Sequence, residues 1–477
     1  MFKIINNELV RISDLVWGVP LIAFIFLVGI YLTLRLNLLQ VFHLPKALKF
    51  VIKNEEDGVG EVSSFGALCT ALSATLGTGN IVGVATAVGV LSGGPGALFW
   101  MLVAAFFGMA SNYAEGFLAI KYRKIDNNNH VLGGPFYYIE YGMGMRWRWL
   151  AKIFAFFGAG AALLGIGTFT QVNGIANVVV GFFDPNHKQI VNILGREYSK
   201  VLIIASIVLT ISVSMVLLGG IQRISNVSQV IVPFMTILYV LICLLLIVIN
   251  RSKLPEAISE ILLGAFGIKP IAGGILASVL VSMRNGVSRG IFTNEAGMGS
   301  TPIASAAAKT NDPVRQGLVT MTATFIDTIV ICTMTGISII MMGSWKATKL
   351  VNGIEIPLEG VEVTAHAFQS GIPLSELTIS FILMVCLVFF AYASIIGWNY
   401  YGERCCEYLT SGNKKALKWY RLFYLLAVFI GPYIAVSAVW TIADIFNGLM
   451  ALPNLIALLA LSGVVIAETK KGLNSIK

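Results

Sequence analysis

The sequence predicts an all-α polytopic membrane protein with eleven transmembrane helices. Only 12% of its 477 residues are charged and 57% are hydrophobic, and the mean hydropathy is +0.82. These values exclude an ordinary soluble domain. Apolar runs of about 20 residues, the length that crosses a bilayer, recur along the chain. The lipid bilayer is therefore the expected surrounding, and no motif indicates a partner subunit.

Eleven spans follow from the lengths of the apolar runs and from their polar interruptions. They cover residues 16–34, 65–91, 97–121, 149–182, 200–219, 227–249, 256–289 (interrupted), 313–342, 374–402, 419–439 and 443–466. The segment before the first run is polar and no cleavage site follows that run, so we expect a helix of the mature protein rather than a signal peptide.

The basic residues orient these spans. With the N-terminus outside, 23 of the 33 Lys and Arg residues fall in inner loops or the inner tail. The positive-inside rule therefore predicts a cell-membrane protein with an outer N-terminus and a cytoplasmic C-terminus. It also explains the net charge of +9 without a nucleic-acid partner.

Residues 73–80, SATLGTGN, interrupt the second span with glycines and polar side chains. Backbone that lacks helical hydrogen bonds cannot face lipid, so an unwound segment at this depth lines a cavity or binds a ligand. Free amides at the start of a half-helix suit a carboxylate, and free carbonyls at the end of the other half suit a cation such as sodium. Close helix packing through small residues is the alternative explanation for such glycines.

A second interruption lies in the seventh span. Residues 267–274, GIKPIAGG, combine a proline with paired glycines, both of which oppose helix continuation. We expect the break at residues 266–274, with residues 284–286 (Arg-Asn-Gly) as the alternative.

The two interruptions divide the chain into matching halves. After a leading helix and loop (residues 1–64), five spans occupy residues 65–250 and five occupy residues 256–466, followed by a tail at residues 467–477. Because five is odd, the halves have opposite orientations. Paired broken helices in inverted repeats indicate a secondary transporter with its site at the membrane midplane.

Four motifs carry a resemblance to a known family. They are GTGNIVGVATAV (77–88), GGPGALFWM (93–101), GIFTNEAGMGSTP (290–302) and DPVRQGLVTM (312–321). In this order they resemble the alanine or glycine:cation symporter family. The resemblance covers the whole chain and implies a LeuT-type core. It also implies sodium-coupled, occasionally proton-coupled, uptake of small neutral amino acids.

The resemblance also implies site residues. It places the substrate carboxylate at the backbone of Gly77, Thr78 and Gly79, with Thr75 and Asn80 beside it. It places sodium at the carbonyls of Ser73 and Leu76, facing Ala391 and the hydroxyl of Ser394 in the ninth span. A helical serine often bonds its own backbone instead.

Other polar and small residues complete the candidate substrate site. Gln171, with Thr168 one turn away, is expected to contact the substrate, although a hydrogen bond to a neighbouring helix is the alternative. Gly273, Gly274 and Ile275 are expected to leave a cavity for a methyl side chain. One methylene changes binding by only about 1–3 kcal/mol, so the pocket restricts size moderately.

Several carboxylates fall within predicted spans, and Asp327, Glu115 and Asp444 are weighed as functional candidates. Asp327 lies near the centre of the eighth span, where proton coupling is one hypothesis. We favour a structural role, with Thr324 and Thr328 as partners. Glu115 and Asp444 lie closer to span ends, where solvation is easier. The NEAGMGS segment (294–300) is expected to shape the cytoplasmic exit or to cap a helix.

The predicted function is sodium-coupled symport of alanine and glycine into the cell by alternating access. No enzyme motif appears, the six cysteines have no metal-ligand spacing, and no cofactor is expected apart from sodium as the coupling ion. A proton-coupled or glutamine-preferring symporter is the alternative. A passive channel is the other class, although no repeated charged ring or carbonyl filter is present.

Overall fold

Helices make up most of the chain in a computed structural model. The structure describes residues 2–53, 58–127, 130–185, 188–193, 196–267, 275–351, 353–434 and 436–475. Within these ranges the side chains of residues 2–7, 14, 193, 196, 275–277, 436–440 and 475 are outside the description.

The first half of the chain contains most of the short elements. Its helices are α1 (Phe2–Val16), α2 (Val19–Arg35), α3 (Leu39–Phe42), α4 (Leu44–Ile52), α5 (Ser64–Thr75), the 3₁₀ turn η1 (Thr78–Asn80), α6 (Val82–Val88), α7 (Gly96–Lys121), α8 (Pro135–Tyr137), the π-helical η2 (Tyr138–Gly142), η3 (Met145–Trp147), α9 (Arg148–Leu164), α10 (Phe169–Phe183), α11 (Lys200–Leu217) and α12 (Gly220–Ile249).

The second half contains the longest helices. Its helical elements are η4 (Arg251–Lys253), α13 (Leu254–Ala265), α14 (Ile275–Asn294), α15 (Thr301–Ser305), α16 (Pro313–Thr324), the π-helical η5 (Phe325–Cys332), α17 (Thr333–Met341), η6 (Ser344–Lys346), α18 (Val361–Gly371), α19 (Glu376–Leu409), α20 (Lys414–Ile430), η7 (Gly431–Tyr433) and α21 (Val436–Ser475).

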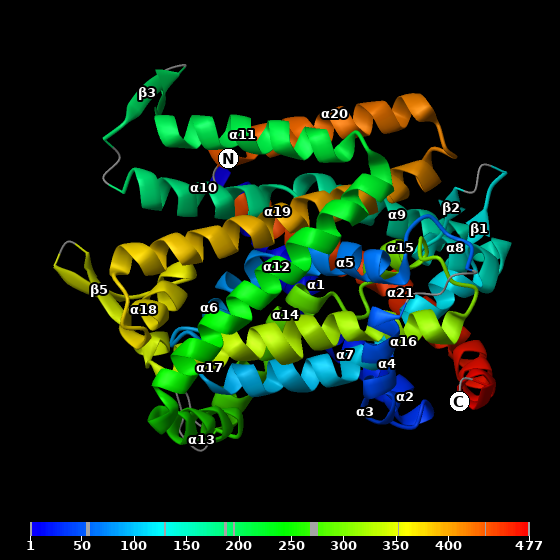
Figure 1. Cartoon of the computed structure of the whole chain (residues 1–477), viewed down its shortest axis with the longest axis horizontal. Coiled ribbons are helices and arrows are strands. Elements are labelled where there is room, and N and C mark those ends of the chain that lie inside the picture. The colour runs from blue at the N-terminus through cyan, green and yellow to red at the C-terminus, as the bar shows by residue number, and fades with distance from the viewer. Residues whose placement is uncertain are drawn as a thin grey trace.

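Within the described ranges, three antiparallel hairpins lie at the two ends of the helix bundle. They are β1–β2 (Lys124–Ile125 with Val131–Leu132), β3–β4 (Ile190–Ile193 with Arg196–Ser199) and β5–β6 (Thr348–Val351 with Ile354–Pro357). Figure 1 shows β3 and β5 at one end, which we call the β5 end. The hairpin β1–β2, helix α8 and the C-terminus lie at the opposite end, the β1 end.

Membrane-spanning helices are numerous in the described part of the chain. Seven helices are long and apolar enough to cross a bilayer, or eight if α5 and η1–α6, bent by 63°, form one span. Helix α2 is apolar but has only 17 residues. These findings support a multi-helix membrane architecture, while the number eleven and the inverted repeat stay predictions.

Helix α7 lies at the centre of the packing. It contacts α14 and α16 most extensively, and α19 contacts α9 and α10. Small residues allow these close approaches: a Cβ atom on Gly286 would lie 2.2 Å from the carbonyl oxygen of Ala97. Gly286 lies within the uninterrupted helix α14, so the alternative break at residues 284–286 is wrong. This glycine serves helix crossing instead.

Candidate functional site

The first interruption is unwound as the sequence predicts. Helix α5 ends at Thr75, η1 begins at Thr78, and the two halves of the span meet at 63°. Gly77 has extended backbone (φ −139°, ψ −158°). Thr75, Thr78 and Asn80 are at most 4% exposed, so this polar segment lies inside the bundle.

Two amides of the break are held by side-chain oxygens. The Gly77 amide donates to Asn80 Oδ1 at 3.0 Å, and the Thr78 amide donates to Gln171 Oε1 at 3.2 Å. Gln171 Nε2 donates in turn to the carbonyl oxygen of Ile166, at 3.2 Å. The donors expected to receive a carboxylate therefore already point at oxygen acceptors, and Gln171 reaches the break from α10.

Two of the predicted sodium ligands are in direct contact. Ser394 Oγ on α19 donates to the carbonyl oxygen of Leu76 at 3.1 Å. Ser73 Oγ donates to the carbonyl oxygen of Thr70 at 2.7 Å and also faces α19, because a Cβ atom on Gly397 would lie 2.7 Å from it. Ala391 is fully buried on the same helix. Hydroxyl and carbonyl oxygens at the end of α5 are suitable donors for a hard cation.

The remaining predicted residues are less closely joined to the break. Thr168 is buried and its hydroxyl donates to the carbonyl oxygen of Leu163 at 2.7 Å. It caps an irregular segment, residues 165–168, that separates α9 from α10 inside one predicted span. Gly273 and Gly274 lie outside the described residues. Ile275 begins α14, and its side chain is outside the description as well.

The end of α14 faces the break, which the sequence analysis did not predict. A Cβ atom on Gly79 would lie 2.9 Å from Thr293 Cγ2, and Asn294 Nδ2 donates to Thr328 Oγ1 at 3.0 Å. The chain then leaves the helix, with positive φ at Glu295, Gly297 and Gly299. The glycines of NEAGMGS, directly after a helix, are the signal that could have located this second unwound segment.

Asp327 is joined to the break by hydrogen bonds. Asn80 Nδ2 donates to Asp327 Oδ1 at 2.7 Å, and Thr328 Oγ1 donates to Oδ2, also at 2.7 Å. The predicted partner Thr328 is therefore confirmed, whereas Thr324 Oγ1 accepts from Asn112 instead. Asp327 lies in the π-helical η5, a rare distortion that is frequent at functional sites.

Cavities approach the break from the β5 end. A cavity of about 190 Å³ extends from Thr78 to Val361, with Asn173, Gly174 and Asn177 of α10 in its wall. Asn177 also borders a cavity of about 570 Å³ beside the end of β6. Thr78 thus borders a cavity that lies on the β5 side of the break.

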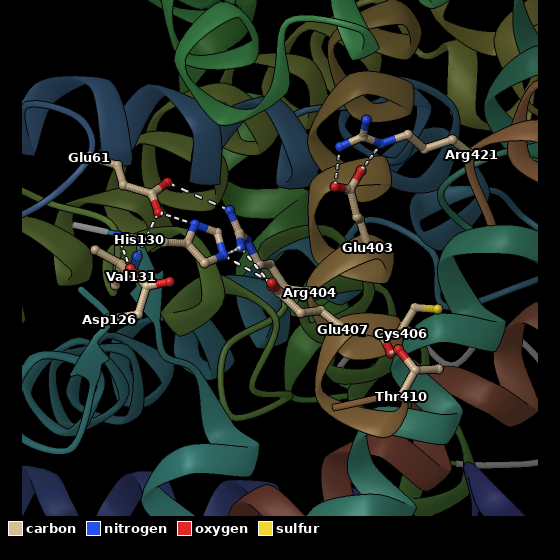
Figure 2. A network of polar contacts seen from close by, with 10 residues as sticks. All are labelled: Glu61, Asp126, His130, Val131, Glu403, Arg404, Cys406, Glu407, Thr410 and Arg421. Atoms are coloured by element: carbon tan, nitrogen blue, oxygen red, sulfur yellow. Dashed lines mark hydrogen bonds and ion pairs between the residues drawn. The ribbon is translucent and has the colours of Figure 1, made fainter. Parts of the chain in front are cut away.

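A network of ion pairs lies at the β1 end (Figure 2). His130 Nδ1 lies 2.9 Å from Glu61 Oε1, and His130 Nε2 lies 2.9 Å from Glu407 Oε1. Arg404 contacts Glu407 Oε2 at 2.6 Å and Glu61 Oε2 at 3.5 Å. The network joins the segment before α5, the β1–β2 loop and α19.

Arg123 adds a second tie at this end. Its guanidinium donates to the carbonyl oxygens of Val59, Ala306, Ala308 and Thr310, at 2.5–2.7 Å. Burial lowers the pKa of Arg123 to about 10. The charge thus holds the segment before α5 against the segment after α15.

The network shifts the pKa of its two loop residues in opposite directions. Hydrogen bonds with Glu407 and then Glu61 raise the pKa of His130 to about 9, against the opposing effects of burial and of Arg404. Burial raises the pKa of Glu61, but the hydrogen bond from His130 and the charge of Arg404 outweigh it, so the net shift is downward. Both groups are charged near neutral pH.

The contribution of His130 to stability should disappear at alkaline pH. Because its pKa is raised on folding, this contribution is complete below the ordinary value of about 6.5 and is lost as pH rises through about 9. Glu61 acts oppositely: its contribution is lost only as pH falls through its lowered pKa. We expect the Tm of the purified protein to fall by a few degrees between pH 7 and pH 10, measured by differential scanning fluorimetry.

The His130→Gln variant provides the control. It should have a lower Tm at pH 7 and a flatter Tm profile between pH 7 and pH 10. An unchanged profile in this variant would show that another group titrates.

Comparison with known proteins points to one family. A sequence profile of the family described as the sodium:alanine symporter family matches residues 2–476. The chain is 48% identical over 467 residues to an uncharacterized transporter of Haemophilus influenzae, with 98% of this chain and 96% of that protein covered. It is 44% identical over 466 residues to the sodium/alanine symporter AgcS of Methanococcus maripaludis, with 96% and 95% covered.

A solved structure shares the fold. The crystal structure of a mutant of the Eremococcus coleocola manganese transporter matches with a TM-score of 0.50 at 14% identity, covering 86% of this chain and 80% of that one. At this identity the likeness extends to the arrangement of helices only.

Proposed function

This chain belongs to the sodium:alanine symporter family, and on that premise we propose that it carries alanine and glycine into the cell together with sodium. At the level of the family it is a multi-pass membrane protein and a cation-coupled amino-acid symporter, not an enzyme. Sodium acts in the proposal as the coupling ion, and no other cofactor takes part.

The observation that carries the proposal is the chemistry of the break. Within three consecutive residues the chain presents the carbonyl oxygen of Leu76, in contact with Ser394, and the backbone amides of Gly77 and Thr78. An amino acid and a cation require these two kinds of group side by side. The amides bind the substrate carboxylate, the carbonyl oxygen binds the cation, and the carboxylate can neutralise the cation beside it. The same juxtaposition couples occupancy of one ligand to occupancy of the other.

Each ligand has a proposed position. The substrate carboxylate binds the amides of Gly77–Gly79, with Thr75, Asn80 and Gln171 around it, and Thr168 supports the segment that positions Gln171. Sodium binds between the carbonyl oxygens of Ser73 and Leu76 and the helix α19, where Ser394 supplies a hydroxyl oxygen and Ala391 a backbone one.

Crowding around the break favours small substrates. A Cβ atom on Gly174 would lie 2.6 Å from Thr78 Cγ2, and one on Gly79 would lie 2.9 Å from Thr293. These two contacts narrow the space for a substrate side chain directly beside the amides. Gly273, Gly274 and Ile275 stay predicted contributors to the methyl pocket.

The two ends of the molecule fit alternating access. With the N-terminus outside and the C-terminus cytoplasmic, the β5 end faces out and the β1 end faces in. The smaller cavity is lined by Thr78 and shares Asn177 with the larger one, and both lie on the outer side of the break, while the Glu61–His130–Arg404–Glu407 network ties the cytoplasmic segments together. Breaking that network is a step that release to the cytoplasm requires.

Uptake by proteoliposomes tests the proposal. Labelled alanine should accumulate only with an inward sodium gradient, saturate with alanine concentration, and be inhibited by glycine more than by glutamine. Accumulation driven equally by a proton gradient supports the proton-coupled alternative, and stronger inhibition by glutamine supports the glutamine-preferring one. Flux far above carrier turnover without accumulation indicates a channel.

Ser394→Ala should weaken sodium binding selectively. Losing one uncharged ligand oxygen costs about 1–2 kcal/mol, which corresponds to a roughly 5- to 30-fold higher half-saturating sodium concentration. Alanine uptake at saturating sodium should remain close to that of the unmodified protein. Ser380→Ala, nearer the β5 end of the same helix, is the control and should leave the sodium dependence unchanged.

A further inference from the structure

Two carboxylates are buried on the β1 side of the break. Glu115 on α7 is 0% exposed, and Glu295, in the turn after α14, is 1% exposed. The expectation that Glu115 is easily solvated near a span end is therefore wrong. The two groups interact electrostatically, and within the described residues neither forms an ion pair.

Three of the four carboxylate oxygens have hydrogen-bond donors. Glu295 Oε1 accepts from Trp398 Nε1 at 3.1 Å, and its Oε2 accepts from the hydroxyl of Ser300. Glu115 Oε1 accepts from the Gly299 amide at 3.0 Å and from Asn454 Nδ2 at 2.6 Å. These donors fix the positions of both carboxyl groups.

The fourth oxygen, Glu115 Oε2, is buried and has no hydrogen-bond partner among the described residues. The hydroxyl of Tyr401, also buried and without a partner in the same part of the chain, interacts electrostatically with both Glu115 and Glu295. A buried, ionised oxygen without a donor is very unfavourable, whereas a protonated one is itself a donor.

We propose that Glu115 is a proton-binding site, with the proton on Oε2, and that uptake requires this proton. Adjacent carboxylates in a dry site do not both ionise, and one retains a proton. A bound metal ion needs several oxygens, whereas Glu115 Oε1 already accepts two hydrogen bonds and only Oε2 of this carboxyl group lacks a partner among the described residues. A proton satisfies that single oxygen without further ligands.

The hydrogen bonds of Glu115 indicate that the protonated carboxyl group holds neighbouring elements together. Asn454 Nδ2 also donates to the carbonyl oxygen of Gly297, at 2.9 Å, so one carboxyl group joins α7, the 295–300 turn and α21. The titratable groups that face Glu115 are Glu295 from the turn, Tyr138 from η2 and Tyr401 from α19. Loss of the proton places two negative charges together and drives these elements apart.

The site is linked to the substrate region through charge. Glu295 interacts electrostatically with Asp327, and Asp327 accepts from Asn80 in the break. Repulsion between Glu115 and Glu295 therefore acts on the end of α14, which faces the break. The uptake component of this inference rests on the proposed symport, but the protonation does not.

Infrared difference spectroscopy tests protonation without transport. At pH 7 the purified protein should show the carbonyl band of a protonated carboxylic acid that is absent from Glu115→Gln. In Glu295→Gln, where the neighbouring charge is gone, this band should disappear at a lower pH. Glu468→Gln removes an exposed carboxyl group on α21 and should leave the band unchanged.

Uptake tests the requirement for the proton. At fixed sodium gradient and membrane potential, uptake should fall about tenfold per pH unit above the pKa of the site. Glu115→Gln mimics the protonated acid and should vary less than about twofold over the same range. His130→Gln, which removes the titration of His130 near pH 9, should keep the full decrease.

Each outcome bears on the proposal. Identical spectra for the protein and Glu115→Gln at pH 7 would overturn the proton site, even if sodium-coupled uptake is normal. A difference band together with sodium-independent uptake would retain the proton site and overturn sodium coupling. A band that is lost in Glu115→Gln while this variant keeps the full pH dependence of uptake would overturn the requirement for the proton.

Discussion

Gly77→Ala should reduce alanine uptake roughly 5- to 150-fold while the protein still inserts and folds. A Cβ atom at this position would lie 2.5 Å from Ser394 Oγ and 3.1 Å from both polar atoms of the Gln171 amide. Overpacking of this kind costs about 1–3 kcal/mol, and each 1.4 kcal/mol is a factor of about ten. The added methyl group would displace Ser394, a proposed sodium ligand, and Gln171, a proposed substrate contact. The affinities for sodium and for alanine should therefore both decrease.

The control is another glycine on a neighbouring helix. Gly181 lies in α10, and a Cβ atom added there would meet no heavy atom of the described residues within 4 Å, so Gly181→Ala should transport normally. Uptake is measured in proteoliposomes, with the amount of folded protein determined by size-exclusion chromatography in detergent. Normal transport by Gly77→Ala would show that the glycine serves only helix packing.

Arg404→Ala should destabilise the protein by about 3–5 kcal/mol, the usual cost of leaving a buried charge unpaired. The Arg404 side chain is 11% exposed, and it contacts Glu61 and Glu407, which are 9% and 14% exposed. Its removal leaves those carboxylates with only His130 between them. We expect a lower Tm and a smaller yield of folded protein.

Arg421→Ala provides the comparison, because Arg421 pairs with Glu403 on the same helix as Arg404 but is 34% exposed. Pairs of this exposure contribute about 0–1 kcal/mol. Scanning fluorimetry in detergent should therefore separate the two variants. Equal Tm values would show that the network does not contribute as a buried ion pair.

Much of the fold follows from the sequence because lipid imposes simple rules. Apolar run length located most of the long helices from α7 to α21, since a helix must cover a fixed thickness. The predicted ends differ from the observed ones by up to nine residues, and the span at 419–439 runs past the end of α20 into α21. Residues 149–182 were predicted as one span, but Gly165 and Gly167 interrupt it between α9 and α10. Run length does not detect this irregular segment, because the run of apolar residues continues through it. The carbonyl groups of the segment find other hydrogen-bond donors, such as the Tyr424 hydroxyl, which lies 2.8 Å from the carbonyl oxygen of Gly167.

Part of the candidate site was predictable as well. Gly77 and Gly79 indicate an unwound segment through local propensity alone. Ser394 was assigned to the same site because the sequence resembles the symporter family. The contacts of Thr293 and Asn294 depend on how α14 meets η1 and η5 in space, which single-sequence patterns do not contain. Glu115 was misjudged because distance along a helix from its end says nothing about the elements that cover it.

Asn80 Oδ1 and Gln171 Oε1 accept hydrogen bonds from the Gly77 and Thr78 amides. These oxygens occupy the positions that the proposal gives to the substrate carboxylate. A carboxylate that arrives there exchanges one acceptor for another, so it gains only the difference between two hydrogen-bonded states. In the proposed function, binding would be correspondingly modest, and departure of the carboxylate would leave no amide without an acceptor. A carrier must release its cargo once in every cycle, and the proposal gives Asn80 and Gln171 the role of keeping the barrier to that release low.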